Sequence, residues 1–191
     1  MHSDGPAEDR DGFRFRGGAN AIDLPATLQA RLSASPRELL SSPRDLSRWL
    51  IFSRMAATVP RTTEQDLATA RALREAIYVL AGRPSGAEAE AARGALNRIA
   101  AGTAAVPRLQ ADASMRLEGD AGALLVTLAR EAVHLFGSDT VELIRQCQSP
   151  SCTIYFIDTS RRGDRRWCSM SACGNNAKVK EFRRRRREIE P

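Results

Sequence analysis

Residues 147–187 read CQSPSCTIYFIDTSRRGDRRWCSMSACGNNAKVKEFRRRRR, and this stretch contains every cysteine of the chain. The cysteines form two pairs with the spacing C-x4-C-x15-C-x4-C, at Cys147, Cys152, Cys168 and Cys173. Two close pairs separated in this way are typical of a structural zinc site, in which four thiolates complete a tetrahedral shell. The sequence therefore predicts one structural zinc ion held by these four side chains.

Two disulfides or an iron–sulfur cluster are the alternative interpretations of the cysteines. The N-terminus MHSDGPAEDRDGFRF lacks a basic segment followed by an apolar one, so no secretory signal is visible and a reducing cytosol is expected. The paired spacing favours zinc over a cluster. A module of about 40 residues buries too little apolar surface to fold alone, so zinc binding is expected to supply its folding free energy.

A secondary structure can be predicted around the cysteines. The β-prone residues 154–157 and a polar turn at 162–164 predict a hairpin that returns to Cys168. The residues after Gly174 are good helix formers, which completes the pattern of a small treble-clef-like zinc finger. On that helix Val179 and Phe182 are predicted to pack over the metal, against Trp167 and Phe156.

The positive charge of the chain is concentrated in this module. From Arg145 onward the chain carries twelve Lys/Arg and five Asp/Glu, a net charge of +7, whereas the preceding residues carry −1. On the predicted helix the basic residues recur with the spacing i, i+3, i+4 and i+7, and they are Lys180, Arg183, Arg184 and Arg187. The predicted hairpin adds a second basic arm, formed by Arg161, Arg162, Arg165 and Arg166.

Such a concentration of arginine predicts a polyanionic partner. Guanidinium groups match phosphate oxygens and the edges of guanine, so nucleic acid is the expected ligand. The alternative is a solvated charged face whose charges pair with Glu181, Glu188 and Glu190. Three acids are too few to neutralise this many bases.

The first 144 residues predict a mostly helical body. Helices are expected at 43–50, at 62–81 with a capping box from Thr62 to Gln65, at about 86–101 and at 122–136. A strand is expected at FRFR (13–16), a hairpin within 106–122, and an unstructured tail over residues 1–12. The body shows no Gly-rich phosphate loop, no Ser/His/Asp set and no carboxylate cluster, and His134 falls on the polar face of its helix. No apolar run is long enough to span a membrane. An enzyme is therefore not expected.

The C-terminal stretch resembles the CGNR-type zinc finger of bacterial transcription regulators. The motifs that carry the resemblance are F-I-D-T-S-R (156–161), R-W-C-S-M (166–170) and C-G-N (173–175). The preceding body is similar to the ABATE domain, on the segments LLSSPRDLSRWL and LLVTLAREAVHLF. The resemblance implies that the four cysteines bind zinc, that DNA is the partner, and that the N-terminal domain senses an unidentified effector. Asn176 stands where the motif has arginine, a role that can pass to Arg166 or Lys178.

The expected architecture is an α+β fold with a mostly helical domain at 13–144 and a zinc finger at 145–191. The expected function is that of a DNA-binding transcription regulator, located in the cytoplasm with the nucleoid. Two other classes stay open. One is a zinc-stabilised adaptor that binds RNA or protein, and the other is a small-molecule binding protein whose finger only stabilises the helical domain.

Overall fold

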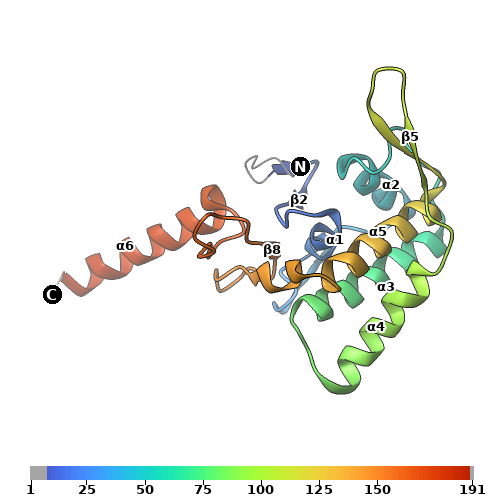
Figure 1. Ribbon diagram of the computed structural model, residues 1–191. Helices are drawn as coiled ribbons and strands as arrows, with labels where there is room; N and C mark the ends of the chain where they lie inside the picture. Colours follow the sequence, from blue (N-terminus) through green and yellow to red (C-terminus); the bar gives the residue numbers. More distant parts are fainter. Residues whose placement is uncertain (1–7, 190–191) are drawn as a thin grey trace.

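The computed structural model describes residues 8–189 and, within that range, every side chain except those of residues 8, 184 and 187–189. The fold is α+β and mostly helical, with four two-stranded antiparallel hairpins and a cysteine cluster near the C-terminus (Figure 1). The elements follow in the order β1 (Glu8–Arg10), β2 (Phe13–Phe15), α1 (Asn20–Asp23), η1 (Leu24–Thr27), β3 (Leu28–Gln29), β4 (Arg37–Glu38), α2 (Pro43–Phe52), α3 (Glu64–Ala81), α4 (Gly86–Ala100), β5 (Val106–Leu109), β6 (Met115–Glu118), α5 (Ala121–Phe136), η2 (Asp139–Leu143), β7 (Ile144–Gln146), β8 (Tyr155–Ile157), η3 (Met170–Gly174) and α6 (Asn175–Ile189).

The body is built on three helices, α3, α4 and α5, which pack side by side (Figure 1). The apolar faces of α3 and α5 form the main core, as their helical periodicity predicts, and the residues buried there include Leu67, Leu73, Ile77, Leu124, Leu125 and Leu128. His134 is exposed, as its helical face predicts. Between residues 8 and 189, none of the helices has both the length and the apolar character of a membrane span.

The helix starts follow from capping side chains. Ser42 caps α2, as the Ser-Pro sequence predicts, and Asp45 completes a capping box with it. The predicted box for α3 is wrong by one residue, because Thr63 accepts from the backbone N–H of Asp66 at 3.1 Å and Asp66 accepts from that of Thr63 at 2.8 Å. Thr62 instead donates to the Pro43 carbonyl oxygen at 2.6 Å, which ties the start of α3 to α2.

The expected unstructured tail over residues 1–12 is wrong for residues 8–12. Glu8–Arg10 forms β1, which pairs antiparallel with β2 so that Asp9 lies opposite Arg14. The turn between the two strands uses positive φ angles at Asp11 and Gly12, where an aspartate and a glycine are well suited. Residues 1–7 lie outside the described residues.

The strand β8 is the element that joins the zinc finger to the body. Its predicted partner, the segment that returns to Cys168, is wrong: β8 pairs with β7, with Ile144 opposite Ile157 and Gln146 opposite Tyr155. Successive side chains of a strand point to opposite faces. Tyr155 and Ile157 accordingly join the main core, whereas Phe156 lies in a second, smaller core with two of the cysteines.

Asp23, at the end of α1, is a buried carboxylate that shapes the chain next to this strand. It accepts from the backbone N–H of Gly17 at 2.6 Å and from that of Arg16. Burial raises the pKa of Asp23 to about 7, and the charge of Glu131 adds to the rise, whereas the two N–H donors and Arg10 oppose it. The carboxyl group is therefore expected to keep its proton in the folded state well above the pH at which it ionises in the unfolded chain.

We expect this raised pKa to make folding stability depend on pH. A group whose folded pKa is raised contributes its full stability below the unfolded pKa of about 4, and that contribution is lost as pH rises toward the folded pKa. Between pH 5.5 and 7.5 the wild-type free energy of unfolding should therefore fall by roughly 2 kcal/mol relative to that of Asp23→Asn, at about 1.4 kcal/mol per pH unit. Urea titrations of both proteins at several pH values measure this difference. Parallel pH profiles for the two proteins would contradict it.

Candidate metal centre

The first cysteine pair is held by a tight backbone turn that follows β7. The Cys147 N–H donates to the Ile154 carbonyl oxygen at 2.9 Å, which continues the β7–β8 ladder. Within the loop, the Cys152 N–H donates to the Ser149 carbonyl oxygen at 2.9 Å. These two bonds bring the sulfur atoms of Cys147 and Cys152 to the same side of the chain.

The second pair is held by η3, a single π-type turn that leads into α6. Ser169 caps the turn by accepting from the Ala172 N–H at 3.3 Å, and the Gly174 N–H donates to the Ser169 carbonyl oxygen at 3.0 Å. A Cβ atom at Gly174 would lie 2.8 Å from the Met170 sulfur and 3.2 Å from the Trp167 ring, so a larger residue there would displace the exposed Met170 side chain.

The four sulfur atoms form a compact cluster that fits a tetrahedral metal ion. All four lie within 4.8 Å of one another, with the Cys168 sulfur 3.8 Å from that of Cys152 and 3.7 Å from that of Cys173. Four sulfurs bonded to zinc at about 2.3 Å stand about 3.8 Å apart at the corners of a tetrahedron. Cys147 and Cys168 are buried, so bulk water does not reach the centre of the cluster freely.

The hydrogen bonds among the thiols are also compatible with a bound cation. Hydrogen bonds from Cys152 and Cys168 lower the pKa of Cys147, and the same bonds raise the pKa values of Cys152 and Cys168. The cluster thus stabilises one thiolate, and repulsion opposes further ones unless a positive ion is present. A divalent cation replaces the remaining thiol protons and stabilises all four thiolates.

The loop between β8 and Cys168 is organised by Asp158, which is buried. Its carboxylate accepts from the backbone N–H of Ser160 at 3.0 Å, from the Ser160 hydroxyl at 2.6 Å and from the backbone N–H of Arg165 at 2.9 Å. Although burial by itself raises the pKa of Asp158, these bonds hold it below its ordinary value. The D-T-S-R motif therefore fixes the shape of the basic loop.

The four arginines of this loop differ in their surroundings. Arg165 donates to the carbonyl oxygens of Trp167 at 2.9 Å and Cys168 at 2.6 Å, and its guanidinium lies 4.5 Å from the centre of the Phe156 ring. Arg166 donates to the Gln148 side chain at 2.7 Å. The other two, at the tip of the loop, are exposed: Arg161 and Arg162. The hydrogen bonds of Arg165 thus hold the backbone at Cys168, the first cysteine of the second pair.

The helix α6 begins at the cysteines, as predicted, but its rotation and packing differ from the prediction. Val179 is 46% exposed and Phe182 is 67% exposed, so their predicted packing against Trp167 and Phe156 is wrong. Arg165 occupies the face of the Phe156 ring instead. Figure 1 shows α6 extending away from the body.

The basic residues of α6 lie along this projecting helix. Those whose side chains are described are exposed, and they are Lys178, Lys180, Arg183, Arg185 and Arg186. Arg184 and Arg187 belong to the same helix, but their side chains lie outside the described part. Asn176 is exposed in the first turn of α6.

The sequence did not reveal that the body contributes to this centre. Ala26 of η1 packs in the small core with Cys147 and Cys168. The Ile157 N–H donates to the Gly17 carbonyl oxygen at 2.8 Å. The only sequence signal for a contribution of the body was the alternation of FRFR (13–16), which predicts a strand with Arg14 and Arg16 on one face. The alternation does not indicate which part of the chain that face contacts.

The fold and the site define a class of protein: a helical domain that ends in a four-cysteine zinc finger. Comparison with family models agrees with this. Residues 18–139 match the ABATE family, described as "Putative stress-induced transcription regulator", and residues 144–186 match the CGNR zinc finger. The chain belongs to the ABATE family and binds one structural zinc ion through its CGNR zinc finger. A search of curated proteins found no match.

We expect Cys168→Ser to remove zinc and to loosen β8 while the helices remain. Cys168 is fully buried and its sulfur lies 3.8 Å from that of Cys152 and 3.7 Å from that of Cys173, whereas the mutual packing of α3, α4 and α5 does not involve the finger. Elemental analysis should show one zinc per wild-type chain and less in the variant, with most of the circular dichroism at 222 nm retained. Ser151→Ala, an exposed change in the turn between Cys147 and Cys152, is the control that should keep its zinc. A stoichiometric, tightly held zinc in Cys168→Ser would contradict the assignment.

Proposed function

We propose that the protein is a transcription regulator that binds DNA through its zinc finger. The observation that carries the proposal is α6, a basic helix whose start is fixed by the zinc cluster and whose length extends clear of the body (Figure 1). Its fifteen residues correspond to a rise of about 22 Å, enough to lie along a groove of duplex DNA. The proposed location is the cytoplasm, with the nucleoid.

The charge of α6 supports a polyanionic partner. The helix carries seven Lys/Arg and two Asp/Glu, and Glu181 is already paired with Arg185 at 2.8 Å. A helix with a net charge of +5 repels a second copy of itself, and it attracts a phosphate backbone. The proposed contacts on the helix are Lys178, Lys180, Arg183, Arg184 and Arg187.

We propose that the arginines of the loop divide their roles. Arg161 and Arg162, exposed at the tip of the loop, are proposed to contact phosphate. Arg166 is proposed to contact phosphate as well, beside its hydrogen bond to the Gln148 side chain. Arg165, first predicted as a contact, is proposed to act mainly by holding the loop, because its guanidinium already donates to two carbonyl oxygens. The proposal assigns the protein no catalytic reaction, since four cysteines leave a zinc ion no open position for a substrate.

The salt dependence of binding tests the nucleic-acid proposal. If α6 and the loop contact four to six phosphates, log K should fall against log salt with a slope of about −4 to −5. Reversing Lys180 and Arg183 to Glu should nearly abolish binding while zinc is retained, because neither side chain belongs to the cysteine cluster. Fluorescence anisotropy with random duplexes, at several salt concentrations, measures both effects.

The matched control is Arg93→Glu with Arg98→Glu, which makes the same change in net charge on exposed positions of α4. It should leave most of the DNA affinity. If both double variants bind like the wild type, the adaptor function takes the place of DNA binding. If single-stranded RNA binds more tightly than duplex DNA at equal salt, RNA is the partner.

Asn176 is proposed to mark a contact that this chain has lost. The resemblance to the CGNR motif implies arginine at this position, and Asn176 is exposed in the first turn of α6. Asn176→Arg should therefore tighten DNA binding and make the salt slope steeper by about one unit. Unchanged affinity in the same anisotropy assay would show that the position faces away from the DNA.

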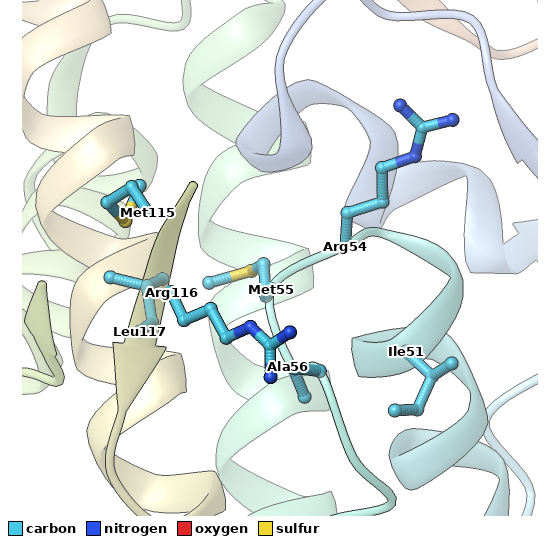
Figure 2. A pocket seen from close by; sticks show the side chains of 8 residues that line it. Ile51, Arg54, Met55, Ala56, Met115, Arg116 and Leu117 are labelled. Carbon is cyan, nitrogen blue, oxygen red and sulfur yellow. The ribbon is translucent and has the colours of Figure 1, made fainter. Parts of the chain in front are cut away.

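A surface cavity supports the further proposal that the N-terminal domain senses a small molecule. It has a volume of about 370 Å³ and lies between the end of α2 and the β5–β6 hairpin. The lining is mainly apolar with two arginines, and it includes Ile51, Met55, Met115, Leu117, Arg54 and Arg116. Figure 2 shows Arg116 extended toward Met55 and Ala56, whereas Arg54 points away from them.

Arg116 gives the cavity its chemical preference. The Arg116 side chain makes no hydrogen bond or ion pair with the described residues, whereas Arg108, directly across the hairpin, is paired with Glu118 at 3.1 Å. A guanidinium above methionine and leucine side chains favours a small organic anion with an apolar body.

Anilinonaphthalene sulfonate is a fluorescent probe of this kind. Arg116→Gln should weaken its binding about tenfold, and Arg108→Gln should not. Equal binding by both variants would exclude the cavity as the site.

A further inference from the structure

The two strands of the β5–β6 hairpin direct different backbone groups outward. At the turn, the Gln110 N–H donates to the Ser114 carbonyl oxygen at 2.8 Å, so these two residues form a hydrogen-bonded pair. Such pairs alternate along an antiparallel ladder, which makes Arg108 and Arg116 the next one. The residues between hydrogen-bonded pairs point their N–H and C=O groups away from the partner strand. On β6 these residues are Met115 and Leu117.

One edge of the hairpin is blocked and the other is open. Pro107 of β5 lies opposite Leu117, at an outward position, where proline has no N–H to offer. On β6 the outward N–H groups are present at Met115 and Leu117. No backbone hydrogen bond joins either of them to another segment within residues 8–189. An edge of this kind can accept an extended chain as an added strand.

The cavity beside α2 lies along the open edge of β6. Its lining includes three successive residues of this strand, Met115, Arg116 and Leu117. Because successive side chains point to opposite faces, a cavity that touches all three follows the edge of the strand. The facing wall comes from the end of α2 and the segment after it, where Met55 is buried. Figure 2 shows Met55 and Ala56 on the side of β6 toward which Arg116 extends.

The side chains along this edge indicate which extended chain would fit. β6 has four residues and spans about 13 Å, so a ligand of a few residues is long enough to pair with it. In an added strand, the residue opposite Arg116 points to the same face as the guanidinium. Its two neighbours point to the face of Met115 and Leu117. An acidic residue between two apolar residues therefore matches both the charge and the polarity of the edge.

We propose that the ligand of this cavity is a short extended peptide that adds a strand to β6 and places an acidic side chain on Arg116. The inference rests on the proposed sensing role of the N-terminal domain and names the chemical class of its effector. Such a peptide is a small organic anion with apolar groups, the kind of ligand that Arg116 favours. Pairing with the outward N–H groups distinguishes it from anions that have no peptide backbone.

Isothermal titration calorimetry of the full-length protein with acetyl-Leu-Glu-Leu-amide tests the proposal. The ends of this tripeptide are blocked, so its only charge is that of the glutamate. We expect one peptide to bind per chain and to displace anilinonaphthalene sulfonate. The matched peptide acetyl-Leu-Lys-Leu-amide should bind about tenfold more weakly, because its ammonium group would lie beside the Arg116 guanidinium.

A pair of variants isolates the contribution of the backbone. Met115→Pro removes one outward N–H and no ladder hydrogen bond, and Met115→Ala removes the same side chain but keeps the N–H. The proline variant should bind the glutamate peptide about fivefold more weakly than the alanine variant. Leu109→Pro, directly across the hairpin at an outward position of β5, controls for the effect of proline and should bind like the wild type. Hydrogen exchange at the Met115 and Leu117 amides should also slow when the peptide binds, which tests the pairing if Met115→Pro does not fold.

Equal binding of the two peptides, equal binding by Met115→Pro and Met115→Ala, or unchanged exchange at Met115 and Leu117 would overturn the proposal. If anilinonaphthalene sulfonate binding depends on Arg116 but the peptide neither binds nor displaces the probe, the peptide proposal fails and the sensing cavity stands. If probe binding does not depend on Arg116, both fall.

Discussion

The structure depends on one short strand with two different neighbours. β8 has three residues, and the alternation of its side chains sends Tyr155 and Ile157 into the core of the helical body while Phe156 packs against the cysteines. A strand that is buried on both faces cannot move relative to either core without exposing apolar surface. Loss of the fully buried Phe156 ring alone would cost about 3–5 kcal/mol. The finger is therefore built onto the body and does not hang from it on a linker.

This arrangement explains how the zinc ion can set the direction of α6 and of the basic residues along it. Zinc joins the turn after β7 to the turn that starts α6, and β8 ties the first of these to the body. Arg165 and Asp158 then hold the loop between them with hydrogen bonds to backbone groups. Without such an anchor, no packing interaction would fix the direction of α6, and repulsion between neighbouring arginines would destabilise the helix. The exposed Phe182 shows that packing against the body does not supply that direction.

What the sequence could predict depended on how local each signal is. The zinc ligands were predictable because cysteine spacing is both local and chemically specific, and the body helices because apolar residues recur with the helical period. The partner of β8 was not, since Ile144, Arg145 and Gln146 form too short a run to be recognised as a strand. Nor could spacing distinguish Arg165 from its neighbours, because only the folded loop decides which guanidinium meets a carbonyl oxygen. The packing of Ala26 with Cys147 and Cys168 joins distant parts of the chain and leaves no periodic pattern.

Amide hydrogen exchange of the full chain, with zinc bound and with zinc removed by a chelator, tests the central claim most directly. If β8 joins the two cores through the zinc cluster, removal of zinc should speed exchange at Cys147 and Ile157, whose N–H groups donate to Ile154 and Gly17 in the folded chain. Exchange should also become faster throughout α6, while the interior of α3 and α5 stays protected. Unchanged protection at Cys147 and Ile157 after zinc removal would contradict the claim.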